Sequence, residues 1–170
     1  FVTTTRVTHA TPAPLYAHCP DRMWECESTI PESSRKCRDI ARQLIEDLPG
    51  RDIRVIMGGG RQCLKSNVTA REFDPLDTWA CYSTDGRDLM ADWAKDKKSR
   101  KQRYKIVENN EQLADVNPDN VDFLLGIFAN GHISMDWSRN DGPKGQPSLE
   151  DMTKMAIKVL RKSNEGFLLV

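Results

Sequence analysis

Short apolar runs alternate with amphipathic helical patterns along this chain, and that alternation narrows the folds open to it. The runs that predict strands are rich in β-branched or aliphatic residues, whereas the patterns between them repeat apolar residues at helical spacing. The expected strands cover residues 1–6, 53–57, 104–107 and 123–128, with another beginning at Phe167, and the expected helices cover 33–48, 86–95, 109–113 and 149–160. This order predicts an α/β fold, with parallel strand pairs in a central sheet and helices on its faces.

Polar capping residues mark the expected helix boundaries. Ser33 and Ser34 are expected to cap the first helix, and Ser148 with Asp151 forms a capping-box pattern at the start of the last. The basic, polar run 97–103 predicts a solvated loop between a helix and a strand.

Three glycines and an arginine, residues 58–61, end the second expected strand. Their spacing matches neither the dinucleotide fingerprint nor the GxxxxGK[ST] phosphate loop. No helical pattern begins directly after them, so no helix N-terminus is expected there to hold an anion. We therefore expect a structural turn, in which glycine allows a close backbone approach or a positive φ.

Composition limits the classes of partner. The 170 residues suffice for one domain with a core, and Lys+Arg and Asp+Glu both number 25, which removes the electrostatic case for binding nucleic acid or an anionic membrane. No apolar stretch approaches the roughly 20 residues of a membrane helix, and no signal peptide is evident. The start at Phe1 without a methionine, and the apolar end at Val170, suggest a fragment or a processed product.

Five cysteines, an odd number, leave at least one thiol free or paired outside the segment. A glycosylation sequon at Asn67, together with the cysteine count, favours an oxidising, secretory compartment. A cytosolic chain with idle thiols remains the alternative.

Candidate chemistry follows the first strand. Thr11 offers a hydroxyl suited to Mg²⁺, and nearby His9 can support a metal-held water. Arg22 offers a planar fork that matches phosphate oxygens, and Asp21 beside it can restrain that fork through a salt bridge. From spacing alone, a capping threonine, a surface histidine and a surface arginine packed on Trp24 are the simpler interpretation.

Longer motifs favour the functional interpretation of these residues over the simpler one. The runs VTTTRVTHATP (2–12), YAH (16–18) and DRMW (21–24) resemble the pattern of animal alkaline phosphatases. Further matches follow in the same order: CRDIA (37–41), VIMGGGR (55–61), DG (85–86), LLGIF (124–128), PSLEDM (147–152) and GFLLV (166–170). The resemblance covers the whole chain, and collinear motifs of this length are very unlikely to coincide by chance.

The resemblance implies that residues 1–170 are the central portion of a single domain, part of a three-layer α/β/α fold with a mainly parallel sheet. It implies hydrolysis of small phosphate monoesters at a two-zinc, one-magnesium site through a phosphoserine intermediate. Thr11 then matches a magnesium ligand, His9 a residue that supports the water shell of that metal, and Arg22 the arginine that holds the substrate phosphate. The serine nucleophile, all zinc ligands and the glutamate that completes the magnesium site are expected outside this segment, so the segment alone is expected to be inactive.

The resemblance also implies a glycoprotein, glycosylated at Asn67, that forms a homodimer and is held on the extracellular face of the cell membrane by a GPI anchor. Cys37 matches a structural cysteine whose partner lies upstream. That match leaves the other four cysteines to pair among themselves, Cys63 with Cys81 and Cys19 with Cys26.

The family's additional Ca²⁺ site is matched only in part. Phe128 corresponds to a residue that binds through its backbone carbonyl, but Ala129 and Gln146 stand where carboxylates are expected. Two missing carboxylates remove most of the charge that holds Ca²⁺, so the site is not expected in its usual form.

Two other functions remain open. One is a metal-dependent sulfatase or phosphodiesterase of the same superfamily, which would differ in its nucleophile. The other is a non-catalytic, disulfide-linked, secreted binding module, which would leave the collinear motifs unexplained.

Overall fold

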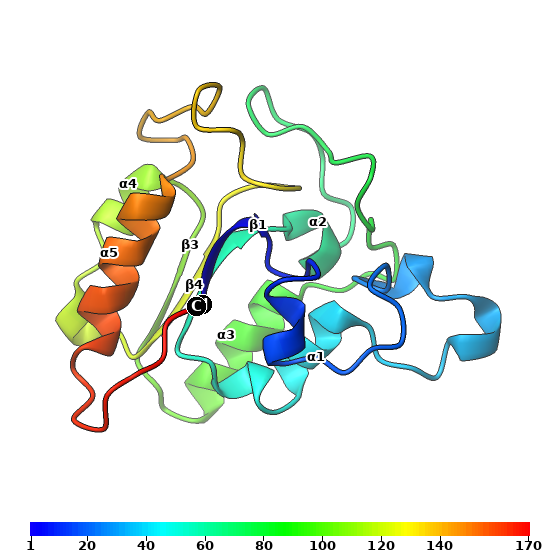
Figure 1. Cartoon of the computed structure of the whole chain (residues 1–170), viewed down its shortest axis with the longest axis horizontal. Helices are drawn as coiled ribbons and strands as arrows, with labels where there is room; N and C mark the ends of the chain where they lie inside the picture. The colour runs from blue at the N-terminus through cyan, green and yellow to red at the C-terminus, as the bar shows by residue number, and fades with distance from the viewer.

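The computed structural model describes all 170 residues around a four-stranded sheet (Figure 1). Its strands are β1 (Val2–Arg6), β2 (Val55–Gly59), β3 (Tyr104–Val107) and β4 (Phe123–Ile127), in the order β1-β2-β4-β3. Every neighbouring pair is parallel. The carboxyl ends of all four strands therefore meet at one edge of the sheet, where open α/β sheets place their ligands.

Helices cover both faces of the sheet, so the predicted α/β fold is confirmed. On one face lie α1 (Ile40–Glu46) and α3 (Leu89–Ser99), and on the other lie α4 (Asn110–Ala114) and α5 (Leu149–Leu160) (Figure 1). A separate hydrophobic core fills each interface, and every residue of β2 and β4 is buried. Burial on both faces explains why these two strands are nearly continuous apolar runs.

Capping side chains fix where the helices begin. Ser148 Oγ accepts a hydrogen bond from the Asp151 backbone N–H at 3.0 Å, so the predicted start of α5 is confirmed. The prediction that Ser33 and Ser34 cap the first helix is wrong. Residues 32–34 form a short 3₁₀ turn, and α1 begins after Asp39, whose carboxylate accepts the backbone N–H of Arg42 at 2.8 Å.

The solvated loop expected over 97–103 is also corrected, because α3 continues into it and Lys97 is fully buried. The Lys97 ammonium contacts Asp96 at 2.8 Å and lies over the rings of Trp93 and Phe123, 5.2 and 4.8 Å from their centroids. The long aliphatic stem allows a lysine to pack in this way while its charge keeps a partner.

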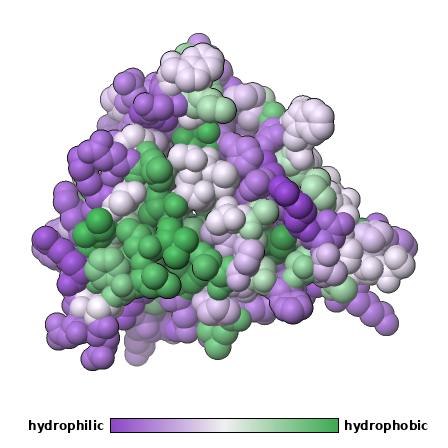
Figure 2. Space-filling view, in the orientation of Figure 1, coloured by the Kyte–Doolittle hydropathy of each residue, from purple (hydrophilic) through white to green (hydrophobic).

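The last expected strand is absent. The segment that begins at Phe167 runs beside β1 but makes one backbone hydrogen bond to it, from Val2 N–H to the Val170 oxygen at 2.8 Å. Because a single bond does not make a ladder, this end of the chain is extended without being a strand. Apolar side chains gather on the face shown in Figure 2, around the C-terminus, and Leu168 is 83% exposed. None of the helices is both long and apolar enough to span a bilayer.

Candidate functional site at the carboxyl edge of the sheet

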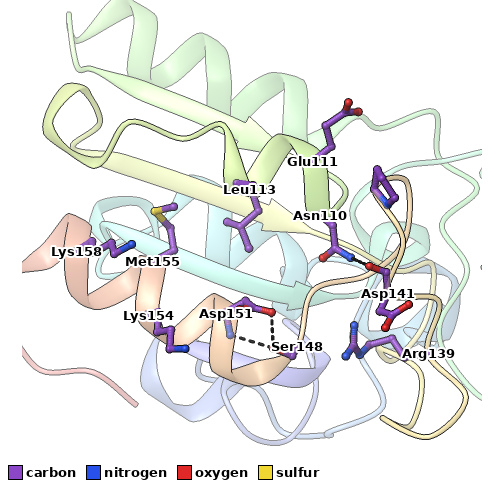
Figure 3. A pocket seen from close by; sticks show the side chains of 12 residues that line it. Asn110, Glu111, Leu113, Arg139, Asp141, Ser148, Asp151, Lys154, Met155 and Lys158 are labelled. Atoms are coloured by element: carbon purple, nitrogen blue, oxygen red, sulfur yellow. Dashed lines mark hydrogen bonds between the residues drawn. The ribbon is translucent and has the colours of Figure 1, made fainter.

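A cavity of about 790 Å³ lies between α4 and α5 (Figure 3). Its lining mixes cations such as Arg139 and Lys158 with carboxylates such as Asp141. The Ser148 hydroxyl in it is no free nucleophile, because it donates to Asp151 as part of the helix cap. None of the candidate site residues His9, Thr11 and Arg22 lines this cavity, whereas all three follow the end of β1.

Arg6, the last residue of β1, anchors that edge. Its guanidinium is buried and forms a two-pronged pair with Glu25, with Nε–Oε2 at 2.9 Å and Nη2–Oε1 at 2.7 Å. Its third nitrogen binds Asp77 at 2.6 Å, and Thr8 donates its hydroxyl to Glu25 at 2.6 Å. The buried carboxylate is thus neutralised and satisfied, and the chain around residue 25 is fixed to the end of β1.

The structure brings Arg22 and His9 together at this edge. Arg22 Nη2 lies 3.4 Å from His9 Nε2, and the Arg22 side chain is exposed. The expected salt bridge from Asp21 is wrong, because that carboxylate accepts the backbone N–H of Met23 at 2.8 Å and closes a local turn. The Arg22 fork therefore projects from a turn without a carboxylate holding it.

Thr11 lies at the same end of β1. It is exposed, and its backbone oxygen accepts the hydroxyl of Thr5, a β1 residue, at 3.2 Å. The loop after β1 therefore presents Thr11 and His9 together, with Arg22 against the latter.

His132, which the sequence analysis did not identify, completes the cluster. It follows β4, accepts the backbone N–H of Arg6 on Nδ1 at 3.0 Å, and contacts His9 edge-on with ring centroids 5.0 Å apart. Burial and the nearby Arg6 charge lower the pKa of both histidines, so both favour the neutral form. No local pattern marks His132, because 126 residues separate it from Arg6.

The glycine turn allows the loop after β4 to reach β1. A Cβ on Gly59 would lie 2.0 Å from the Gly131 backbone oxygen, and Gly60 has a φ of +100°. The expectation of a structural turn with close backbone approach is confirmed. The expectation that no helix follows is wrong, since the one-turn helix α2 (Arg61–Leu64) begins at once.

Arg61, the arginine of that motif, is an internal cation rather than a ligand-binding group. Its guanidinium binds Asp74 at 2.6 Å, the Asn130 side-chain oxygen at 2.8 Å and the Ile127 backbone oxygen at 3.0 Å. These bonds tie the loop near residue 74 to the end of β4.

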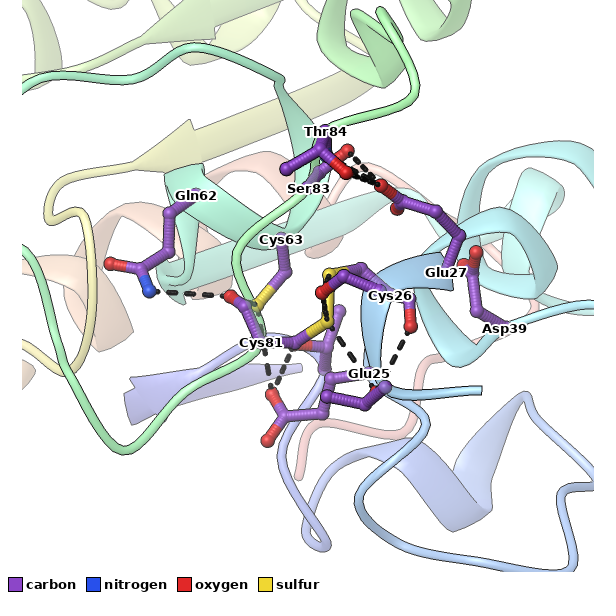
Figure 4. Close-up of a disulfide and its surroundings, with 12 residues drawn as sticks. Glu25, Cys26, Glu27, Asp39, Gln62, Cys63, Cys81, Ser83 and Thr84 are labelled. Atoms are coloured by element: carbon purple, nitrogen blue, oxygen red, sulfur yellow. Dashed lines mark hydrogen bonds between the residues drawn. A yellow bond between two sulfur atoms is a disulfide. The ribbon is translucent and has the colours of Figure 1, made fainter. Parts of the chain in front are cut away.

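A disulfide joins Cys26 to Cys81, with their Cα atoms 5.7 Å apart (Figure 4). The expected pairs, Cys63 with Cys81 and Cys19 with Cys26, are therefore wrong. Cys63 is a buried thiol that donates to the Cys81 carbonyl at 3.3 Å, and burial raises its pKa. Cys19 and Cys37 are free within this chain. The 3₁₀ turns after Cys26 leave it facing the loop of Cys81, an arrangement that sequence spacing does not encode.

The residues of this segment fit a metal site only in part. No group of three or more His, Cys, Asp or Glu side chains is placed to hold a metal ion. Thr11 offers one exposed hydroxyl oxygen, a donor that suits Mg²⁺, and neutral His9 lies near it in sequence. These two groups fit a share of a magnesium site that needs carboxylates from elsewhere.

Calcium does not fit. Ala129 is buried and carries no side-chain oxygen, and the Gln146 side-chain oxygen already accepts the backbone N–H of Ser134 at 2.9 Å. Ca²⁺ is held mainly by charged carboxylate oxygens, and neither of these two positions supplies one.

Comparisons with known proteins point to one family. The family model for alkaline phosphatase matches residues 1–170. The alkaline phosphatase of Gadus morhua is 42% identical over 172 residues, which cover 99% of this chain and 35% of that protein. The tissue-nonspecific isozyme of Homo sapiens is 42% identical over 175 residues, covering 99% and 32%. The membrane-bound alkaline phosphatase of Bombyx mori is 36% identical, covering 99% and 30%.

Solved structures agree as well. The crystal structure of Thermus thermophilus alkaline phosphatase superposes with a TM-score of 0.64 at 30% identity, covering 98% of this chain and 27% of that one. The chain spans about a third of the length of the curated relatives it matches. On the match of a family model to its whole length, the chain belongs to the alkaline phosphatase family.

Proposed function

We propose that this chain is the central portion of a single domain in a longer enzyme that hydrolyses small phosphate monoesters, and that Arg22 binds the phosphate. The observation that carries the proposal is the exposed Arg22 guanidinium at the carboxyl edge of β1, against His9. The family match supports phosphatase chemistry over the sulfatase and phosphodiesterase alternatives.

Arg22 differs from the other arginines at this edge. Arg6 and Arg61 are buried and neutralised by carboxylates within 3 Å, whereas Arg22 forms no ion pair with any carboxylate of the chain. Its paired N–H donors are thus open to two non-bridging oxygens of a phosphate. A guanidinium in that place stabilises charge as it redistributes in the loose transition state of phosphoryl transfer.

Thr11 and His9 serve the magnesium ion in this proposal, Thr11 as an oxygen ligand and His9 through the water shell. Bound zinc and magnesium ions would supply charge neutralisation and activation of the attacking oxygen. The zinc ligands and the serine that accepts the phosphoryl group lie in other parts of the enzyme, and water then hydrolyses the phosphoserine. Because the enzyme binds the phosphate rather than the leaving alcohol, it would accept a broad range of monoesters.

The location and modification of the enzyme are inferred in the same way. Asn67 is exposed in a turn with a φ of +57°, and we infer that it carries a glycan. The Cys26–Cys81 disulfide and the sequon favour secretion. A relative from Bombyx mori is named as membrane-bound. We infer a homodimer held outside the cell by a lipid anchor.

The test is Arg22→Ala in a full-length protein that contains this segment. We expect weaker inhibition by phosphate and a fall in kcat/KM on the order of a hundredfold, because the lost donors act on developing charge. Arg35→Ala is the matched control, since Arg35 is also exposed and pairs only with Glu32 on the surface. If phosphate inhibition and kcat/KM are both unchanged in Arg22→Ala, Arg22 does not belong to the site.

The isolated 170-residue segment is expected to release no phosphate from p-nitrophenyl phosphate, because it contains no cluster able to hold zinc. Zinc-dependent release by the purified segment would contradict the proposed division of the site.

A further inference from the structure

Arg22 depends on its backbone for its position. The exposed side chain has one neighbour within hydrogen-bond range, His9 at 3.4 Å. The turn that carries it is closed by local bonds, from Met23 N–H to the Asp21 carboxylate at 2.8 Å and from Trp24 N–H to the Asp21 carbonyl at 3.1 Å. Such bonds shape the turn but do not orient it on the protein.

Orientation comes from the residues that follow. Trp24 and Glu25 accept backbone N–H groups from the start of α1, at 2.9 Å from Ile40 and 3.2 Å from Ala41. Glu25 is also bound to the end of β1 through Arg6, as described above. Beyond Cys26 the chain passes into short 3₁₀ turns, and residues 31–38 are almost all exposed. Cys26 therefore lies between the turn of Arg22 and this exposed segment, beside Glu27, whose carboxylate accepts the backbone N–H of Asp85 at 3.0 Å.

The other half of the disulfide is seated on the sheet. The Cys81 carbonyl accepts the side-chain amide of Gln62 at 3.2 Å and the thiol of Cys63 at 3.3 Å (Figure 4). Both donors belong to α2, all of whose residues are buried and which directly follows β2. Cys81 is thus held at the carboxyl edge of the sheet, and the disulfide fixes Cys26 to the same place.

We propose that the Cys26–Cys81 disulfide positions Arg22 for phosphate binding, by fixing the turn that carries it to the end of β2. The proposal rests on the function assigned to Arg22. The disulfide touches no substrate and acts through the four-residue step from Cys26 back to Arg22.

The first test is Cys26→Ser combined with Cys81→Ser in a full-length protein that contains this segment. We expect KM and the inhibition constant for inorganic phosphate to rise about three- to tenfold, with a smaller change in kcat, because a displaced guanidinium loses binding geometry. In an Arg22→Ala background the same pair of substitutions should change neither value further. Cys63→Ser is the matched control, since serine keeps a donor toward the Cys81 carbonyl and the disulfide stays intact.

A second variant reaches the same step without disturbing the bridge. Met23 is 48% exposed and lies between Arg22 and the fixed residues, so Met23→Gly adds backbone freedom there at little risk to folding. It should weaken phosphate inhibition, whereas Met23→Ala should not. Peptide mapping of the unreduced wild type should recover Cys26 linked to Cys81.

Three results would overturn the proposal. They are unchanged phosphate inhibition in the cysteine pair or in Met23→Gly, an equal loss in the Arg22→Ala background, and recovery of Cys26 as a free thiol. If the wild type neither hydrolyses p-nitrophenyl phosphate nor is inhibited by phosphate, the proposed function itself fails. If Arg22→Ala weakens phosphate binding but the cysteine and glycine variants do not, only the positioning role fails.

Discussion

Replacing Arg6 by methionine should cost the protein far more stability than replacing a similarly bonded arginine on the surface. Arg6 gives Glu25 two charge-assisted hydrogen bonds and Asp77 a third, and the Arg6 and Glu25 side chains are only 6% and 4% exposed. Arg6→Met leaves the Glu25 carboxylate buried with one remaining strong donor, the Thr8 hydroxyl at 2.6 Å. Breaking a buried pair from one side typically costs about 3–5 kcal/mol, because the remaining charge stays desolvated.

Arg103 provides the comparison. It binds Asp122 with the same two-pronged geometry, at 2.7 Å for each bond, but its side chain is 56% exposed. Water replaces the lost partner there, so Arg103→Met should lower the free energy of unfolding far less than Arg6→Met does. The two substitutions remove the same chemistry and differ mainly in burial.

The assay is urea-induced unfolding of a full-length protein that contains this segment, with variants compared at one protein concentration and the slope of the transition checked for change. Adding Glu25→Gln to Arg6→Met should recover part of the loss, because the orphaned charge is then removed. The reasoning is refuted if Arg6→Met costs no more than Arg103→Met, or if the second substitution recovers nothing.

Two further predictions concern pH and backbone packing. Burial, with Arg6 nearby, lowers the pKa of His9 and His132 below the ordinary 6.5, so as pH falls through that value the unfolded state takes up protons first and stability declines. Unfolding measured from pH 8 to pH 5 should show this loss, and a smaller one in His132→Gln; a flat profile would contradict it. Gly59→Ala places a Cβ 2.0 Å from the Gly131 oxygen, so it should lower the free energy of unfolding by at least about 1–3 kcal/mol in the same urea assay. Wild-type stability in that variant would show that the loop after β4 does not press on β2.

Much of the fold could be predicted because the periodicity of apolar residues determines where strands and helices form. The strands at 104–107 and 123–127 were placed almost to the residue, since buried parallel strands have a strong local signature. The first helix was started too early, because serines at 33–34 and Asp39 are all competent caps and tertiary packing decides between them. Lys97 was placed in solvent because nothing local indicates that Trp93 and a strand residue would cover its stem.

The candidate site residues could be predicted where they lie on one loop, but not where residues from several loops meet. Thr11, His9 and Arg22 follow β1 closely and carry a family motif, so sequence placed them at one strand end. The contacts of Glu25 and His132 were found only in the structure, because they depend on which loops the order of the strands brings together. The disulfide was mispaired for the same reason, since connectivity does not follow from spacing.

One arginine joins loops that leave three different strands. The Arg6 guanidinium binds Glu25 from the loop after β1 and Asp77 from the loop that follows β2 and α2, and its backbone N–H donates to His132 from the loop after β4. A change of length or sequence in any one of these loops displaces the shared anchor of the other two. The three loops are therefore constrained to evolve together, and a lysine, with a single ammonium in place of the planar fork, cannot take over the junction.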